Sequence, residues 1–313
     1  MDRIICVVGP TASGKTALSI ALCRKFDGEV LSCDSMQLYR GMDIGTAKPT
    51  AEEMAGIPHH MIDCIDPCED FSVSRYVEQA DAILQDILRR GRTAVVAGGT
   101  GLYLDALIAG RSFAPLPATG KREELKRLAA ERGIDAVLDI LREADPESAA
   151  RLHENDEKRI IRAAEVYLET GKTITEHNRE TQLQPPKYRP VYLGLNFENR
   201  QDLYDRIDRR VDAMVEAGLF DEVARLAARG LRPDSTAMQA IGYKEPLAAL
   251  RGEITREEAI EAVKRESRRY AKRQLSWLRR NPAIHWLTMS REPDFGAVCT
   301  AAYAIVEKEG ACG

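Results

Sequence analysis

The sequence predicts an α/β fold with a P-loop NTPase-like parallel sheet core and an all-helical insertion domain. In the first hundred residues, short apolar runs alternate with amphipathic segments, which is the pattern of strands linked by crossover helices. Residues 121–170 show only helical periodicity, and a strand-like run follows at residue 188. The predicted domains are therefore a core of residues 1–117 and 188–313 and an insertion of residues 118–187.

The first part of the core contains three candidate strands and two candidate helices. We expect strands at residues 3–8, 29–33 and 93–97, and helices at residues 16–26 and 74–90. Residues 74–90 place Val77, Ala80 and Leu84 on one helical face. Residues 93–97 form a continuous apolar run, as expected of a strand buried on both faces of a parallel sheet.

The insertion begins after a proline-containing break at residues 114–117 and ends at a second break at residues 184–187. Within it, Asp145 before Pro146 and either Asn155 or Asp156 are candidate helix N-caps. A strand is expected at residues 188–196, where Pro190 indicates a position near a sheet edge or limits the strand to the residues after the proline. The remaining elements are helices at residues 200–217, 220–229 and 255–280, a strand at residues 283–289 and a final helix.

The composition is that of a soluble globular protein, and the cysteines indicate a reducing compartment. Hydrophobic residues make up 44% of the 313 residues, charged residues make up 30%, and the net charge is −4. No apolar run approaches the roughly 20 residues of a membrane span, and the N-terminus does not resemble a signal peptide. The seven scattered cysteines favour free thiols, and Cys64 with Cys68 makes a poor zinc half-site. We expect a cytoplasmic protein without zinc.

The strongest local motif is a phosphate-binding loop. It matches G-x-x-x-x-G-K-[ST] in full and consists of Gly9, Pro10, Thr11, Ala12, Ser13, Gly14, Lys15 and Thr16. A strand before the loop and a helix after it direct backbone amides and the helix dipole at phosphate oxygens. Lys15 supplies a positive charge, and the Thr16 hydroxyl is a candidate ligand for Mg²⁺. The motif predicts binding of a di- or triphosphate but does not name the reaction.

A kinase would be the ordinary interpretation of this loop, but the expected second carboxylate is missing. The strand at residues 93–97 ends in Gly98-Gly99-Thr100-Gly101, which contains no acid. The acid that does follow a strand is Asp34. At the carboxyl end of a strand it is placed to act as a base, while a turn or capping role is the alternative.

Six further segments, taken with the phosphate loop, resemble the tRNA dimethylallyltransferase family, the isopentenyl-diphosphate:tRNA transferases. The longest runs from Asp34 to Pro49 and reads DSMQLYRGMDIGTAKP. The others are PHH at residues 58–60, GGTGLY at 98–103, NDEKRIIR at 155–162, IGYK at 241–244 and KRQLSW at 272–277. They span nearly the whole chain in the family's order.

The resemblance implies transfer of the dimethylallyl group from dimethylallyl diphosphate to the exocyclic amine of an adenosine in tRNA. In the family this adenosine is 3′-adjacent to the anticodon in tRNAs that read codons beginning with U. The loop would then hold a diphosphate leaving group, with Mg²⁺ at Thr16. The implied catalytic residues are Asp34 as general base, Arg210 and Lys15 on the diphosphate, and Thr100 on the target nucleotide.

The resemblance also implies contacts to the tRNA anticodon stem-loop. The residues carried over are Asp34, Ser35, Met36, Gln37, Thr100, Arg122, Lys158, Arg159, Ile160, Ile161, Arg162, Gln239, Ala240, Ile241, Gly242, Tyr243 and Lys244. The insertion is expected to be a mobile clamp that closes on the anticodon stem. The target adenosine must be swung out of the anticodon loop, because a stacked base cannot reach a pocket.

A basic band near the C-terminus adds to these contacts. Residues 264–280 contain eight basic residues and one acid, and Lys264, Arg268 and Lys272 follow i, i+4 spacing. Such a band suits a phosphate backbone, and Arg268 and Lys272 are its predicted RNA contacts, although a solvated helix face is the ordinary alternative. Two other functions remain open from the sequence, namely a P-loop nucleotide or small-metabolite kinase and a non-catalytic RNA-binding module. A monomer that does not bind membranes is expected.

Overall fold

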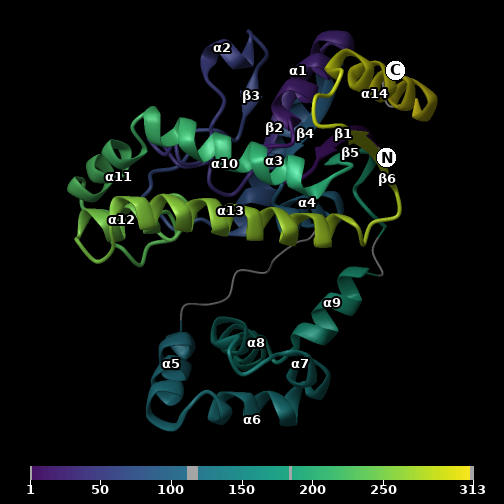
Figure 1. Ribbon diagram of the computed structural model, residues 1–313. Helices are drawn as coiled ribbons and strands as arrows, with labels where there is room; N and C mark the ends of the chain where they lie inside the picture. Colours follow the sequence, from purple (N-terminus) through teal and green to yellow (C-terminus); the bar gives the residue numbers. More distant parts are fainter. Residues whose placement is uncertain (1, 111–118, 183–184, 311–313) are drawn as a thin grey trace. The chain divides into compact units, whose positions relative to one another are not determined.

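The computed structural model describes residues 2–110, 119–182 and 185–310. The chain divides into two compact units, one made of Met1–Gly110 with Lys187–Gly313 and one made of Arg111–Pro186. The first is an α/β unit and the second is helical (Figure 1). The predicted break at residues 114–117 and the start of the second break, Gln184, lie outside the described residues.

The α/β unit is built on one six-stranded parallel sheet in the order β3-β2-β4-β1-β5-β6. The strands are β1 (Asp2–Val8), β2 (Gly28–Cys33), β3 (His59–His60), β4 (Thr93–Gly98), β5 (Tyr188–Phe197) and β6 (Ile284–Met289). Strand β5, which follows the helical unit in sequence, pairs directly with β1. The carboxyl ends of all the strands share one edge of the sheet, where α/β proteins bind ligands. The predicted α/β class is confirmed.

Helices cover this sheet and extend beyond it. Those of the α/β unit are α1 (Lys15–Lys25), α2 (Ala51–Met54), α3 (Val73–Arg89), α4 (Gly101–Ile108), α10 (Arg200–Glu216), α11 (Leu219–Ala228), α12 (Lys244–Leu250), α13 (Arg256–Leu278) and α14 (Phe295–Glu309). The strands and helices predicted from periodicity are confirmed, with ends shifted by no more than two residues. Four short elements, α2, β3, α4 and α12, were not predicted, because they are too short to show a hydrophobic period.

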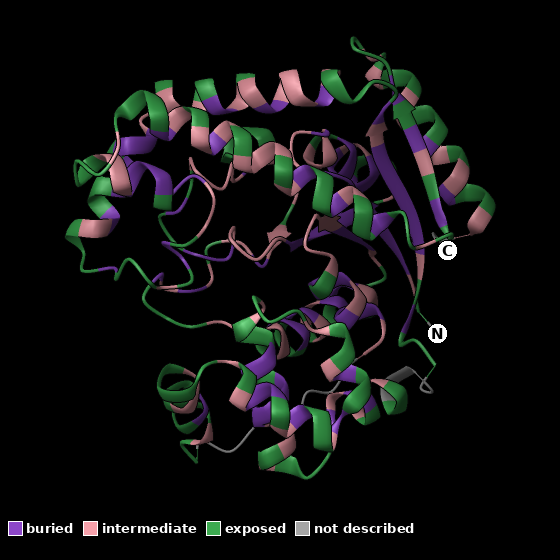
Figure 2. Cartoon of the chain, turned by 60° about the horizontal axis from the view of Figure 1, so that its bottom comes forward, coloured by how far each residue is buried: buried purple, intermediate pink, exposed green. Residues whose placement is uncertain are grey.

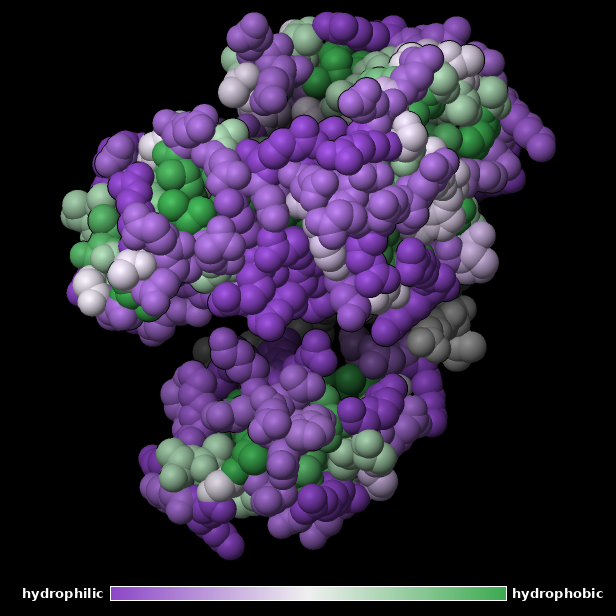
Figure 3. Space-filling view, viewed as in Figure 1, coloured by the Kyte–Doolittle hydropathy of each residue, from purple (hydrophilic) through white to green (hydrophobic). Residues whose placement is uncertain are grey.

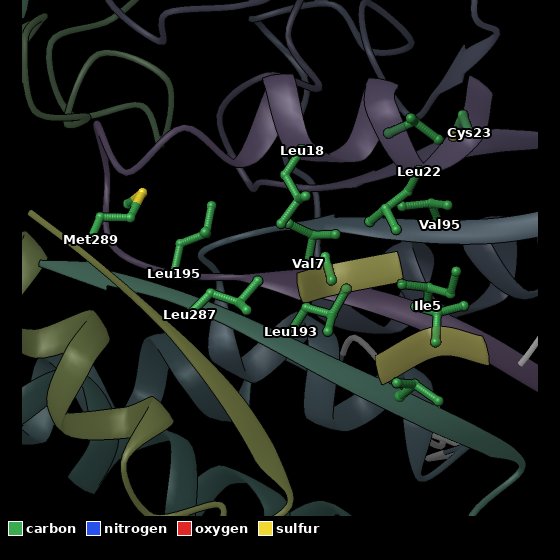
Figure 4. Close-up of a cluster of buried hydrophobic side chains, with 14 of the residues drawn as sticks. Ile5, Val7, Leu18, Leu22, Cys23, Val95, Leu193, Leu195, Leu287 and Met289 are labelled. Carbon is green, nitrogen blue, oxygen red and sulfur yellow. The ribbon is translucent and has the colours of Figure 1, made fainter. Parts of the chain in front are cut away.

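The hydrophobic core lies between the sheet and its helices. Successive side chains of a strand point to opposite faces, so one strand serves two layers. On one face, Ile5 and Val7 of β1 pack with Leu18 and Leu22 of α1 (Figure 4). On the other side, α3 is fixed to β2 by a 3.0 Å hydrogen bond from the Tyr76 hydroxyl to the Ser32 carbonyl. Most residues of β1, β2 and β5 are accordingly buried (Figure 2).

Pro190 lies inside β5 and does not shorten it. It pairs with Ile4 of β1, but β6 begins only opposite Tyr192, so β5 is unpaired on its other side at this position. The missing N–H of Pro190 is tolerated because the strand is locally an edge. The expected position near an edge is confirmed.

The second unit is helical throughout its described residues. It contains α5 (Lys121–Arg132), α6 (Asp135–Ala144), α7 (Pro146–Arg151), α8 (Glu157–Thr170) and α9 (Ile174–Gln182). Its own core includes Val137 and Leu141 of α6 and Ile160 of α8. The predicted N-cap Asp145 accepts a 3.0 Å hydrogen bond from the Ser148 amide and a 2.7 Å bond from the Thr175 hydroxyl, which ties α7 to α9.

Among the described residues, no helix combines the length and the apolar character that crossing a membrane requires.

Candidate active site

The phosphate loop lies between β1 and α1, at the carboxyl edge of the sheet. Gly9 opens the loop with φ of +155°, and a Cβ atom there would lie 2.8 Å from both the Leu195 carbonyl oxygen and Ser13 Oγ. Only glycine therefore lets the loop pass this close to β5. The helix that follows begins at Lys15, so its amino end faces the loop's concave side.

Two loop side chains are suited to an anionic ligand. Lys15 Nζ donates to the backbone oxygens of Gly9 and Pro10 at 3.0 and 2.7 Å. Burial lowers the pKa of Lys15 to about 8, the positive charge of Arg210 adds to this shift, and the Asp34 carboxylate opposes it. Ser13 Oγ is buried and has no hydrogen-bond partner in the described part of the chain. A phosphate oxygen would neutralise the positive charges of Lys15 and Arg210 and would accept a hydrogen bond from the Ser13 hydroxyl.

A cavity of about 630 Å³ opens on this loop. It is lined by residues 11–16 and by Arg206, Arg209 and Arg210, which project from α10. The Arg206 guanidinium donates to the Ala12 carbonyl at 3.2 Å, and that of Arg210 donates to the Ala47 carbonyl at 3.3 Å. Burial lowers the pKa of Arg210. Poorly solvated cations beside a phosphate loop form a strong site for a polyanion.

A second cavity of about 310 Å³ adjoins the first. Its walls are more apolar and include Met36, Ile207, Met214, Ile241 and Val263. The two cavities share the lining residues Thr11, Asp34, Thr46, Ala47, Arg210 and Tyr270. One cavity thus offers charge to a phosphate, the other offers a less polar surface, and Asp34 belongs to both.

Asp34 directly follows β2 and is held by its own turn. Its Oδ1 accepts from the amides of Met36 and Gln37 at 2.9 and 3.4 Å, and its Oδ2 takes part in neither bond. The predicted capping role and the predicted chemical role are therefore compatible, because each uses a different oxygen. Burial, together with the Asp34 carboxylate, raises the pKa of Tyr270 across the cavity to about 12.

Thr100 lies beside this turn as the N-cap of α4. Its hydroxyl accepts from the Ser35 amide at 3.2 Å, and Thr100 is not among the lining residues of either cavity. Its contact with the target nucleotide stays a prediction. What the structure shows is that Thr100 fixes the backbone next to Asp34.

Several lining residues had no predicted role, among them Arg206, Tyr270 and Gln274. Arg206 is one of several arginines on α10, and helical spacing gave no reason to choose it. Tyr270 and Gln274 come from α13, and Gln274 accepts from the Thr11 amide at 2.8 Å and donates to the Gly99 carbonyl at 3.1 Å. Gln274 lies in the KRQLSW segment that carries the family resemblance, and this position was the available signal for it.

Magnesium has a suitable but small set of protein ligands. Thr16 lines the cationic cavity and a smaller third cavity of about 50 Å³, which Asp34 also lines. Among the residues that the structure describes, no cluster of three or more acidic, histidine or cysteine side chains could hold a metal. Mg²⁺ typically keeps waters and binds substrate phosphates with one or two protein oxygens, so the Thr16 hydroxyl fits it.

The predicted RNA contacts fall into different environments. Lys158 and Arg159 are exposed on α8, Arg162 donates to Glu165 at 2.9 Å, and Arg122 lies 4.0 Å from the same carboxylate. Ile160, Ile161 and Tyr243 are only 0%, 4% and 0% exposed, so their side chains belong to the protein core, and their contact with tRNA stays a prediction. Gly242 is buried beside Tyr243, whereas Gln239 and Lys244 are exposed.

The basic band on α13 is only partly available. The guanidinium of Arg268 contacts both carboxylate oxygens of Asp208 at 2.6 Å, and Lys264 lies 2.7 Å from Asp212, so α10 neutralises both. Lys272 and Arg273 are exposed. The surface over α13 is largely hydrophilic (Figure 3).

Comparisons with known proteins identify the family of the chain. The IPP transferase family profile matches residues 37–281, and that of the isopentenyl transferases matches residues 2–65. The chain is 47% identical to the tRNA dimethylallyltransferase of Caldanaerobacter subterraneus over 91% of both chains. It is 49% identical to that of Halalkalibacterium halodurans over 92% of both.

Solved structures give the same result. The tRNA isopentenylpyrophosphate transferase from Bacillus halodurans matches with a TM-score of 0.74 and 43% identity, covering 99% of this chain and 98% of that one. A eukaryotic dimethylallyltransferase acting on tRNA matches with a TM-score of 0.82 and 31% identity, covering 98% and 78%. These relatives support the predicted prenyl transfer rather than a kinase. The chain belongs to the IPP transferase family, together with relatives named tRNA dimethylallyltransferase.

Proposed function

We propose that the protein transfers the dimethylallyl group from dimethylallyl diphosphate to the exocyclic amine of the adenosine 3′-adjacent to the anticodon. The tRNAs concerned read codons that begin with U. The observation that supports this proposal most directly is the position of Asp34, which lines both the cationic and the apolar cavity. A base at that junction suits a reaction between a diphosphate ester and a nucleobase.

The cationic cavity would receive the diphosphate. The loop amides, Lys15 and Arg210 would stabilise the negative charge that develops as the carbon–oxygen bond breaks. Because these groups are already fixed by backbone hydrogen bonds, little rearrangement is required when the charge develops. Magnesium bound at Thr16 would supply further neutralisation of the departing diphosphate.

The second cavity would receive the adenine. Its exocyclic amine forms the new carbon–nitrogen bond, the diphosphate leaves with the bonding electron pair, and the amine then carries an extra proton. Asp34 Oδ2 would accept that proton, while Oδ1 stays in the turn. The base must leave its stack to enter the cavity.

Transfer of label tests the proposal. The protein is incubated with dimethylallyl diphosphate labelled in the prenyl group and with unmodified tRNA, and the label in RNA and the released diphosphate are both measured. A tRNA with guanosine at the target position is the control. We expect equal amounts of labelled RNA and diphosphate with the adenosine tRNA and neither with the control. Absence of label from the adenosine tRNA would contradict the proposal.

A further inference from the structure

Glu222 is a buried carboxylate outside the reacting groups, and it binds four neutral donors. It lies on α11 and is 2% exposed. Its Oε2 accepts from the amides of Asp43 and Ile44 at 3.0 and 2.9 Å. Its Oε1 accepts from the Gly45 amide at 3.1 Å and from the Tyr243 hydroxyl at 2.7 Å. Three successive amides that converge on one carboxylate stabilise its charge in the same way as a phosphate-binding nest.

The same contacts fix Tyr243 against the backbone. A Cβ atom on Gly45 would lie 2.5 Å from Tyr243 Cε2, so the ring packs directly on the glycine. Burial and the Glu222 charge raise the pKa of Tyr243, which keeps its hydroxyl protonated as a donor. Glu222, Gly45 and Tyr243 therefore form one interlocked contact between segments that are far apart in sequence.

Both segments continue directly into the walls of the active-site cavities. Thr46 and Ala47 follow Gly45 and line both cavities. The Ala47 carbonyl accepts from Arg210 and from the Gln37 side chain, each at 3.3 Å. On the other segment, Ile241 lies two residues before Tyr243 and lines the apolar cavity. A shift at Glu222 would be passed to Arg210 and to the wall opposite it.

We propose that Glu222 is a positioning residue for prenyl transfer. It touches neither cavity, and it sets the distance between the loop that holds Arg210 and the segment that faces the target base. This inference rests on the proposed function, because it assigns the apolar cavity to the nucleotide. The buried Glu222 carboxylate holds two cavity walls in place by accepting hydrogen bonds from neutral donors.

The test is Glu222→Gln, which keeps the size of the side chain. The glutamine side chain has one oxygen and one NH₂ group, so in either orientation the NH₂ group faces two of the four donors. Of these donors only the tyrosine hydroxyl can also accept a hydrogen bond, so at least one backbone amide loses its acceptor. We expect the single-turnover rate to fall by at least about tenfold and KM for tRNA to rise, since a misplacement of about 1 Å can cost about a hundredfold.

Glu29→Gln is the matched control. Glu29 is also 2% exposed and accepts from Arg90 at 2.9 Å and from His60 at 2.7 Å, which lower its pKa to about 2. It lies at the amino end of β2, whereas Asp34 follows the carboxyl end. Both variants should melt at lower temperature, but Glu29→Gln should keep the wild-type single-turnover rate in its folded fraction.

Tyr243→Phe removes one donor and leaves the three amide bonds, so we expect a smaller loss of rate than in Glu222→Gln. A folded Glu222→Gln protein with wild-type rate and wild-type KM for tRNA would overturn the inference. If that variant does not fold, Tyr243→Phe decides, and a lower melting temperature with an unchanged rate would overturn it. Failure of the wild-type protein to label tRNA would instead refute the proposed function.

Discussion

At the scale of single residues, Asp34 gives the most direct test of the chemistry. An asparagine can keep the Oδ1 bonds to the Met36 and Gln37 amides, so the turn should survive in Asp34→Asn. It cannot accept the amine proton, and loss of a general base typically costs about a hundred to ten thousand-fold in rate. We expect that loss in single-turnover transfer, with unchanged melting temperature and dimethylallyl diphosphate affinity. A wild-type rate in the folded variant would refute the base assignment.

Ser13 allows stability and ligand binding to be separated. Its hydroxyl is buried without a partner among the described residues, so Ser13→Ala removes no hydrogen bond within the protein. The melting temperature should stay the same or rise, because an unsatisfied buried polar group is costly. If a diphosphate oxygen is the missing partner, calorimetry should show dimethylallyl diphosphate affinity weaker by about tenfold. Unchanged affinity would mean that the hydroxyl has no role in the cradle.

A residue's role could be predicted when its partners lie nearby in the sequence, and not when they are distant. The phosphate loop and Asp34 were predicted because each depends on a strand end and its neighbours within a few residues. Glu222 and Gln274 could not be predicted, because most of their partners are distant in sequence: three of the four donors to Glu222 lie 177–179 residues away, and the two partners of Gln274 lie 175 and 263 residues away. Ile160 and Ile161 share a segment with exposed basic residues but lie on the buried side of α8, which the sequence alone did not show.

At the scale of elements, α13 combines a structural face with a face available to RNA. Lys264 is paired with Asp212 and is 15% exposed, whereas Lys272, two turns further along, is exposed. Only a cation that is not neutralised within the protein releases counterions when it meets a phosphate. The even basic band suggested by the sequence is therefore divided by carboxylates of α10, which sequence spacing alone could not show.

Log affinity for tRNA falls as log salt concentration rises. In Lys272→Ala this negative slope should become shallower by about 0.7 to 0.9, the value of one phosphate contact. Lys264→Ala is the control on the same helix, and it should leave the slope unchanged while lowering the melting temperature slightly through loss of the Asp212 pair. Binding is measured by titration at four or more salt concentrations. Equal slopes for Lys272→Ala and the wild type would mean that Lys272 does not contact a tRNA phosphate and belongs to a solvated helix face.

At the scale of the whole molecule, the chain is an α/β unit whose sequence is interrupted by a helical unit with its own core. The clusters around β1 and around α8 share no residue. The chain leaves and re-enters the α/β unit at one place, because the Lys187 amide donates to the Ile108 carbonyl at 2.9 Å. This arrangement could be anticipated from the change of period in the sequence, whereas the sheet order depends on pairings between distant strands and could not.

Excision of the helical unit tests whether the α/β unit binds the diphosphate and the helical unit binds the tRNA. Because residues 108 and 187 are hydrogen-bonded, a short glycine linker can replace residues 111–186 without stretching β5 away from β1. We expect the shortened protein to fold and to bind dimethylallyl diphosphate with wild-type affinity, since the lining residues of the cationic cavity all lie outside the excised segment. Its tRNA affinity should fall by at least about tenfold, because the exposed basic side chains of α8 are lost.

Calorimetry with the diphosphate and filter binding with tRNA measure the two quantities on one preparation. If tRNA affinity survived the excision, the helical unit would not be a tRNA clamp, and if diphosphate binding were lost in a folded protein, the cationic cavity would depend on residues that its lining does not include.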